Sequence, residues 1–327
     1  MYQKTLRACV LAGAVALLLL IPPMASAQFA EVPIRLSLDL AHELWLETNP
    51  EIRAARQNIA AARADVLDAS LWPNPRVGFD SENYALSAAA RSNGFLDEQN
   101  LVVRVEQLLE TGGKRGKRTA VAEKGVAAEE AALADTVRRL RLELDRTYWR
   151  VVLAAEQLGL AEQILADFDR ILSLSRERYR QGGASGLEVA RLATERLRFF
   201  EDRAEAELAL RNAKVALLAL IGVDDLDRDF VVVEELALEP ANHDLATLER
   251  QALGSRPDLA GSAALLQQAD ARVSYAQALA VPDITPFVGY NRNFGQDAIA
   301  FGVSLDLPLT DRNQGGVARA VAERGRQ

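Results

Sequence analysis

Three places in the sequence combine residue types that could do chemistry. The run from Gly112 to Thr119 suggests a phosphate-binding loop, but no glycine lies five residues before a Gly-Lys-Ser/Thr triplet, as that loop requires. A basic strand-to-helix junction near lipid headgroups explains the run better. His42-Glu43 suggests a zinc protease, yet Leu46 occupies the place of the second histidine. Asp224-Asp225 has no clustered partner, so we expect no catalytic, cofactor-binding or metal-binding residues.

The first 27 residues are predicted to be a signal peptide. Lys4 and Arg7 precede an apolar run from Val10 to Ile21, and Ala25-Ser26-Ala27 supplies the small residues of a cleavage site before Gln28. The run of about 12 apolar residues is shorter than the roughly 20 that a membrane-spanning helix needs. We therefore expect export. Cys9 precedes the apolar run, so no lipid anchor is expected.

Removal of this peptide limits which metal ions and nucleic acids the mature chain could bind. It takes away Cys9 and both methionines, which leaves His42 and His243 as the only imidazoles and excludes thiolate metal sites. Subtracting Lys4 and Arg7 from 38 basic residues leaves 36 against 46 acidic ones, a net charge near −10. Nucleic acid is therefore not an expected partner.

Two stretches, residues 73–111 and 282–309, change from helical spacing to the alternation of β-strands. The turn signal Asn93-Gly94 divides the first stretch. Each stretch predicts a hairpin, and strands of about 9 to 11 residues are long enough to cross an outer membrane. The last strand predicts two faces: Phe301, Val303 and Leu305 toward lipid, and Gly302, Ser304 and Asp306 toward a lumen.

Alternation alone also fits a half-buried sheet in a soluble protein, and this alternative stays open. Four strands cannot close a barrel, and open sheet edges are not tolerated in lipid. The membrane interpretation therefore requires several copies, with three chains giving twelve strands.

The remaining sequence predicts long helices. From Lys114 to Gln181 there is no proline, and apolar residues recur in steps of three, four or seven, which gives one helix of roughly 100 Å. Residues 181–186 break this helix, and Leu187 to Ile221 form the return arm of a hairpin. The apolar positions that we assign to the return arm are Ala190, Leu197, Ala204, Leu208, Val215 and Leu218.

The return arm and a helix from Pro50 to Trp72 together nearly match the long helix in length. They are expected to meet at mid-height, beside a short helix from Leu36 to Thr48 and a strand-like run from Phe230 to Leu238.

The sequence also contains an internal repeat. Asn49-Pro50-Glu51 corresponds to Arg256-Pro257-Asp258, and Ala120-Val121-Ala122-Glu123 recurs 200 residues later as Ala320-Val321-Ala322-Glu323. Helix, hairpin and helix therefore occur twice, and only the first copy is complete. We expect about 94 further residues, so the chain is expected to be truncated at its C-terminus.

These features resemble the outer membrane factor family typified by TolC. The strongest matches are Asn49-Pro50-Glu51, the tip Arg178-Tyr179-Arg180-Gln181-Gly182 with Leu187-Glu188-Val189, and Arg256-Pro257-Asp258. Trp72-Pro73-Asn74-Pro75 and the run from Glu110 to Arg115 resemble the branch that serves cobalt-zinc-cadmium cation pumps.

The resemblance implies a mainly α fold with β: a long periplasmic α-helical hairpin, and four transmembrane strands contributed to a trimeric twelve-stranded barrel. The expected organisation is a signal peptide (1–27), an N-terminal equatorial segment (28–49), a tunnel helix (50–72), the first outer-membrane hairpin (73–111), the helical hairpin (112–221) with its tip at 181–186, a second equatorial segment (222–256), a tunnel helix (257–281), the second outer-membrane hairpin (282–309) and the start of a truncated helix (310–327).

The implied function is a passive trimeric duct in the outer membrane, extending into the periplasm and exporting substrate, heavy-metal cations among the candidates. Its implied partners are a periplasmic adaptor protein, an inner-membrane pump, expected to be proton-driven, and outer-membrane lipid. Docking on the adaptor is expected at the tip residues, which are Arg178, Tyr179, Gly182, Gly183, Ala184, Ser185, Gly186 and Leu187. The alternative function is a soluble periplasmic adaptor with a coiled-coil hairpin. The entrance gate would lie partly in the missing segment, so we assign no gate residues.

Overall fold

The structure is a computed structural model that describes residues 33–82, 100–237, 244–293 and 296–327. The expected signal peptide, the Asn93-Gly94 turn and His243 lie outside these residues. In chain order the elements are β1 (Arg35–Leu36), α2 (Leu38–Thr48), α3 (Pro50–Ser70), β2 (Arg76–Glu82), β3 (Asn100–Glu106), α4 (Lys114–Arg180), α5 (Gly186–Ile221), β4 (Val231–Val232), α6 (Leu245–Ser255), α7 (Pro257–Ala278), β5 (Ile284–Asn293), β6 (Gln296–Leu305) and α8 (Gln314–Arg326).

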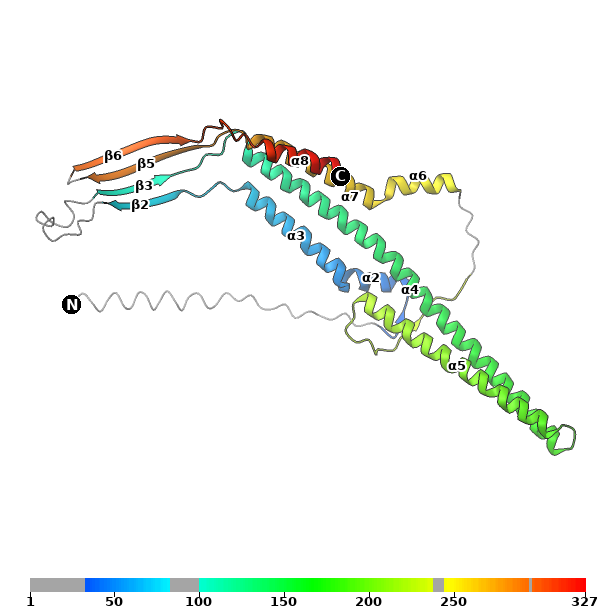
Figure 1. Ribbon diagram of the computed structural model, residues 1–327. Helices are drawn as coiled ribbons and strands as arrows, with labels where there is room; N and C mark the ends of the chain where they lie inside the picture. Colours follow the sequence, from blue (N-terminus) through cyan, green and yellow to red (C-terminus); the bar gives the residue numbers. More distant parts are fainter. Residues whose placement is uncertain (1–32, 83–99, 238–243, 294–295) are drawn as a thin grey trace, which may run out of the picture.

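The molecule is long, with a β-sheet at one end and the tip of a helical hairpin at the other (Figure 1). Strands β2, β3, β5 and β6 form one antiparallel sheet in that order. The fold is mainly helical with four long strands, which confirms the expected class. Across the described residues, every helix is either too short or too polar to serve as a transmembrane span.

Helix α4 runs the whole length of the helical part (Figure 1). Near the sheet it packs against α3 and α7, and α8 packs on the far side of α7. Beyond mid-height its only helical neighbour among the described elements is α5, which returns beside it from the tip. Phe168 of α4 and Phe199 of α5 bring their ring centroids within 4.8 Å inside this hairpin.

The apolar positions assigned to α5 from sequence are partly wrong. Leu197 and Leu208 are exposed, and Phe199, Leu210 and Leu217 lie on the side that is covered. Helix α5 therefore carries two apolar stripes. The sequence pattern identified one that does not face α4, because heptad spacing alone does not say which neighbour a stripe contacts.

The hydrophobic core lies where α2, α3, α4 and α5 meet. Its largest fully buried side chains include Trp45, Tyr148 and Phe230. Here β1 pairs in parallel with β4, through Arg35 with Val231 and Leu36 with Val232. Both expected elements of this belt are shorter than predicted: the helix starts at Leu38 because Leu36 belongs to a strand, and the strand-like run keeps only two paired residues.

Helix α6 was not predicted. Asp244 caps it by accepting a hydrogen bond from the Thr247 amide at 3.0 Å. None of its residues is buried. Its sequence is as long as that of α2, and each of the two helices comes just before a proline that starts the next helix. Helix α6 is therefore the second-repeat equivalent of α2.

Candidate functional site

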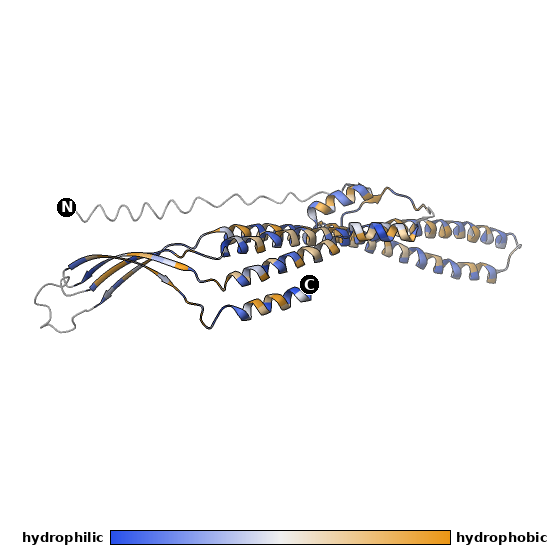
Figure 2. Ribbon diagram, turned by 90° about the horizontal axis from the view of Figure 1, so that it is seen from above, coloured by the Kyte–Doolittle hydropathy of each residue, from blue (hydrophilic) through white to orange (hydrophobic). Residues whose placement is uncertain are grey.

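The four-stranded sheet has one apolar face. Directly paired residues point to the same side, and the register pairs Phe79 with Val103, Val103 with Tyr290, and Val288 with Phe301. The face also holds the other predicted lipid-facing residues of β6, Val303 and Leu305. Most of its side chains are exposed in the isolated chain, with Phe301 at 84%, whereas Val103 is half-buried. Figure 2 shows the strands with apolar and polar residues along their length.

The opposite face is mainly small or polar. It carries Gly302 and Ser304 of β6, while Asp306 follows the end of that strand. Val102 and Phe287 are exceptions. The ring of Phe287 fills the space over Gly302: a Cβ at Gly302 would come within 2.7 Å of that ring. The guanidinium of Arg104 stacks over Phe287 with its carbon 5.1 Å from the ring centroid.

Two glycines and a buried ion pair form the joint between β3 and α4. Gly112 and Gly113 have φ of +63° and +69°, a conformation that side chains other than glycine rarely adopt. Lys114 is 5% exposed, and its Nζ lies 2.7 Å from Asp283 Oδ1, just before β5. The same oxygen accepts a hydrogen bond from the Thr111 amide at 2.9 Å. The glycine-rich run thus joins the β3–α4 connection to the α7–β5 connection, and its lysine is paired with Asp283.

A second ion pair, between Arg118 and Glu110, joins the end of α3 to the joint between β3 and α4. Arg118 Nη1 lies 2.5 Å from Glu110 Oε1, and its other nitrogens donate to the carbonyls of Ala69 and Leu71 at 3.0 and 3.1 Å. The hydrogen bond to Glu110 raises the pKa of Arg118 above its usual value. Since these carbonyls end α3, Arg118 acts as a C-terminal cap supplied by another helix.

The predicted tip lies between α4 and α5. Arg178 donates to the Gly183 carbonyl at 3.3 Å, and Ser185 caps α5 by accepting from the Glu188 amide at 3.1 Å. Tyr179 and Leu187 are exposed at 53% and 63%. Ala184 is half-buried.

Only one of the three tip glycines requires glycine for its backbone conformation. Gly182 has φ of +77°, whereas Gly183 and Gly186 do not have positive φ. Gly186 instead lies beside the ring of Tyr179: a Cβ built on Gly186 would be 3.5 Å from that ring.

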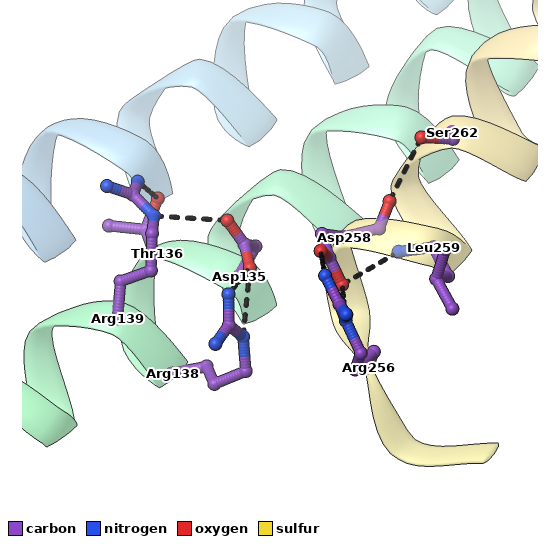
Figure 3. Close-up of polar contacts among 8 residues, drawn as sticks. All are labelled: Asp135, Thr136, Arg138, Arg139, Arg256, Asp258, Leu259 and Ser262. Carbon is purple, nitrogen blue, oxygen red and sulfur yellow. Dashed lines mark hydrogen bonds and ion pairs between the residues drawn. The ribbon is translucent and has the colours of Figure 1, made fainter. Parts of the chain in front are cut away.

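Figure 3 shows the charged residues that surround the start of α7. On α4, Asp135 pairs with Arg138 at 2.7 Å and with Arg139 at 3.0 Å. On α7, Arg256 Nε lies 3.0 Å from Asp258 Oδ1, and this hydrogen bond is the main reason that the pKa of Asp258 falls to about 2. The charge of Arg138 also lowers the pKa of Asp258, and the charge of Asp135 adds to the rise in the pKa of Arg256 that Asp258 causes. The charged residues of α4 therefore act on the Arg256–Asp258 pair at the start of α7.

The other residues singled out from sequence do not form one site. His42 Nε2 lies 2.5 Å from Asp145 Oδ1 and joins α2 to α4, as expected of a junction residue. Asp224 and Asp225 lie in an exposed turn after α5. Among the described residues, no three His, Cys, Asp or Glu side chains are close enough to hold a metal ion.

A row of exposed apolar side chains follows α4 on a side that α5 does not cover. We call it the α4 stripe. It consists of Leu142, Trp149, Leu153, Leu160, Ile164, Ile171 and Leu174. The steps of seven, four and three are those of a helix that packs against a further helix. This stripe was not predicted from the sequence, although the same periodicity identifies it.

The matching family model, described as "Outer membrane efflux protein", covers residues 42–223. The chain is 25% identical to the cobalt-zinc-cadmium resistance protein CzcC of Cupriavidus metallidurans, over 88% of this chain and 66% of CzcC. It is 27% identical to the nickel and cobalt resistance protein CnrC of the same organism, over 91% of this chain and 69% of CnrC. The solved CmeC outer membrane channel of Campylobacter jejuni has the same fold, with a TM-score of 0.69 at 17% identity, over 88% of this chain and 65% of CmeC. The chain thus spans about two thirds of the length of these proteins.

Proposed function

The chain belongs to the outer membrane efflux protein family, and on this basis we propose that it is the outer-membrane duct of a tripartite efflux system. The sheet lies in the outer membrane and the helices extend into the periplasm. Transport through such a duct is passive, and the pump supplies both the energy and the selectivity.

The two-faced sheet is the observation that carries this proposal. Its apolar face suits lipid and its mainly polar face suits an aqueous lumen. Strands β2 and β6 are the edges of the described sheet, and unpaired edges are not tolerated in lipid. Pairing of β6 with β2 of the next copy keeps the antiparallel order. Three copies would then give twelve strands, so the duct is a homotrimer.

The helical part supports the same assembly. The α4 stripe needs a helical neighbour, and a ring of copies supplies one. The exposed tip, with Tyr179 and Leu187, is the contact for the hairpin of a periplasmic adaptor protein, which in turn connects the duct to the inner-membrane pump. A proton-driven pump is the type that we infer. The alternative that the chain is itself an adaptor gains no support from its relatives.

Heavy-metal cations are the substrates that we propose, because the names of CzcC and CnrC record resistance to cobalt, zinc, cadmium and nickel. Tight binding inside a duct would slow export. The polar face carries Arg104 and scattered carboxylates such as Asp80 and Glu106. Among the described residues no three His, Cys, Asp or Glu side chains are close enough to hold a metal ion, which suits a path through which metal passes without being held.

Efflux in living cells tests the function. The chain, extended to the full length of its relatives, is expressed in a strain that lacks its own duct but keeps a matching pump and adaptor, and cellular zinc, cobalt and cadmium are measured. We expect lower metal content and protein in the outer-membrane fraction. Leu187→Asp should remove efflux while leaving the same amount of protein in that fraction, because it alters only the exposed tip. Protein in the soluble fraction, or metal content unchanged by the wild-type chain, would contradict the proposal.

A further inference from the structure

The end of α3 exposes an aromatic ring that is stacked with a cation from another helix. Leu71 and Trp72 are 55% and 52% exposed. The guanidinium carbon of Arg115, in the first turn of α4, lies 4.4 Å from the centroid of the Trp72 ring. This stacking holds the two side chains together at the surface. We call Leu71, Trp72 and Arg115 the Trp72 surface.

Arg115 has no carboxylate partner among the described residues, unlike its neighbours. Lys114 pairs with Asp283, and Arg118 pairs with Glu110. Lys117 also lacks a partner in the described chain, but two residues along an α-helix place it about 200° away from Arg115. Within the described part of the chain, the guanidinium donors of Arg115 therefore have no hydrogen-bond acceptor and can bind a ligand. Since the stacked ring occupies one face of the guanidinium, those donors remain free at its edge.

The Trp72 surface lies at the border between the sheet and the helices. Trp72 follows α3 and comes just before β2, which starts at Arg76 and places Val77 on the apolar face. At the opposite end of that face the residues become polar, with Tyr290 donating to Asp297 at 2.5 Å. The apolar part of the face thus has a polar border at each end, and the border near the helices carries a tryptophan and an arginine.

We propose that the Trp72 surface binds the phosphate headgroup of a phospholipid in the inner leaflet of the outer membrane. This inference rests on the proposed function, which places the apolar face in that membrane. A tryptophan ring prefers the depth of the headgroups, where its apolar body and N–H are both satisfied. A guanidinium binds phosphate through two parallel hydrogen bonds. The positive charge of Arg115 favours an anionic headgroup over contact with a further apolar helix, which would bury that charge without a partner.

The position of Trp72 is tested by fluorescence quenching in lipid vesicles. The whole chain is reconstituted in vesicles of phosphatidylcholine brominated near the headgroup end of its acyl chains, and emission is compared with that in unbrominated vesicles. We expect Trp72→Phe to remove most of the quenchable emission. Trp149→Phe is the matched control, since Trp149 lies in α4 far from the sheet, and it should leave quenching unchanged.

The role of Arg115 is tested by binding of phosphatidylglycerol to the detergent-purified chain, measured by native mass spectrometry. Arg115→Gln should weaken this binding about tenfold, the loss of one charge-assisted contact. Arg141→Gln, at an exposed position of the same helix, should change it little. Equal phosphatidylglycerol binding by the Arg115→Gln and Arg141→Gln variants would overturn the inference. Quenching that persists in Trp72→Phe would overturn it too, and this is the result expected if a second copy of the chain shields Trp72 from lipid.

These outcomes separate the inference from the proposed function. A chain that fails to enter outer membranes contradicts the function itself. A chain that enters them and shows no dependence on Trp72 or Arg115 contradicts only the headgroup site.

Discussion

At the scale of single residues, Asn49 joins three helices of the core, α2, α3 and α5. Its backbone amide donates to the Trp45 carbonyl of α2 at 3.0 Å. Its Oδ1 accepts hydrogen bonds from the amides of Glu51 and Ile52, at 2.9 and 3.1 Å, and so caps α3. Its Nδ2 donates to the carbonyl of Leu220 near the end of α5 at 2.8 Å. The side chain is buried. The Asn-Pro-Glu motif that marks a helix start in the sequence therefore also fixes where the return arm ends.

Asn49→Ala should lower the free energy of unfolding by about 1–3 kcal/mol, because it removes a helix cap and leaves the partly buried Leu220 carbonyl without its donor. Ser185→Ala is the control. Ser185 also caps a helix, α5, but it is exposed and accepts only a local hydrogen bond. Its loss should cost less. Chemical unfolding followed by circular dichroism measures both, and equal losses would show that the bond to Leu220 adds nothing.

The pair Arg256–Asp258 gives stability that depends on pH. Arg256 holds the pKa of Asp258 at about 2, below the ordinary 3.8. A carboxylate with a lowered pKa in the folded state stabilises that state above the unfolded pKa, and this contribution disappears as the pH falls toward 2. Asp258→Asn should therefore destabilise the chain at pH 5 and 6 and make almost no difference at pH 2. Asp224→Asn, in an exposed turn, is the control. A loss of stability in Asp258→Asn that stays constant from pH 6 to pH 2 would contradict a role for the Arg256–Asp258 pair.

At the scale of elements, the tip turn depends on Gly182 more than on its neighbours. Gly182→Ala places a Cβ in the left-handed region, at a cost of about 1–2 kcal/mol. Gly183→Ala should cost much less, since its Cβ would meet only the Arg178 carbonyl at an ordinary 3.5 Å. Hydrogen exchange of the tip amides measures the difference. Similar protection in the two variants would mean that the turn tolerates either substitution.

Elements with a strong local pattern could be predicted from the sequence. The alternation in residues 296–305 correctly indicates a strand with two different faces, and the absence of proline from 114 to 180 indicates one long helix. Elements that depend on distant partners could not. The strand β1 is two residues long and forms only because β4 lies beside it. The pairing of Lys114 with Asp283 joins positions 169 residues apart, and no local spacing points to it.

The same distinction applies to apolar stripes. Heptad spacing in α5 identifies an amphipathic helix, but Leu197 and Leu208 face away from α4 in the structure. A helix in a tunnel wall has a neighbour on each side and therefore two stripes. Sequence periodicity cannot assign either stripe to its neighbour, because that depends on the packing of the whole molecule.

At the scale of the whole molecule, the α4 stripe should hold copies of the chain together. Leu160→Glu places a charge in the stripe and should reduce the trimer fraction seen by light scattering in detergent, with unchanged helix content. Ser173→Glu, exposed on α4 but outside the stripe, should leave the trimer intact. A trimer that survives Leu160→Glu would mean that the copies associate through the sheet alone.

The orientation of the sheet is the central claim, and two neighbouring residues of β6 test it most directly. Val303 and Ser304 lie at nearly the same depth but on opposite faces. Each is replaced by cysteine after Cys9, the one native cysteine, has been changed to serine. Intact outer membranes are then treated with a water-soluble maleimide. We predict strong labelling of Ser304→Cys, which faces the lumen, and protection of Val303→Cys, which faces lipid. Equal labelling at both positions, or labelling of Val303→Cys alone, would contradict a membrane sheet with this orientation.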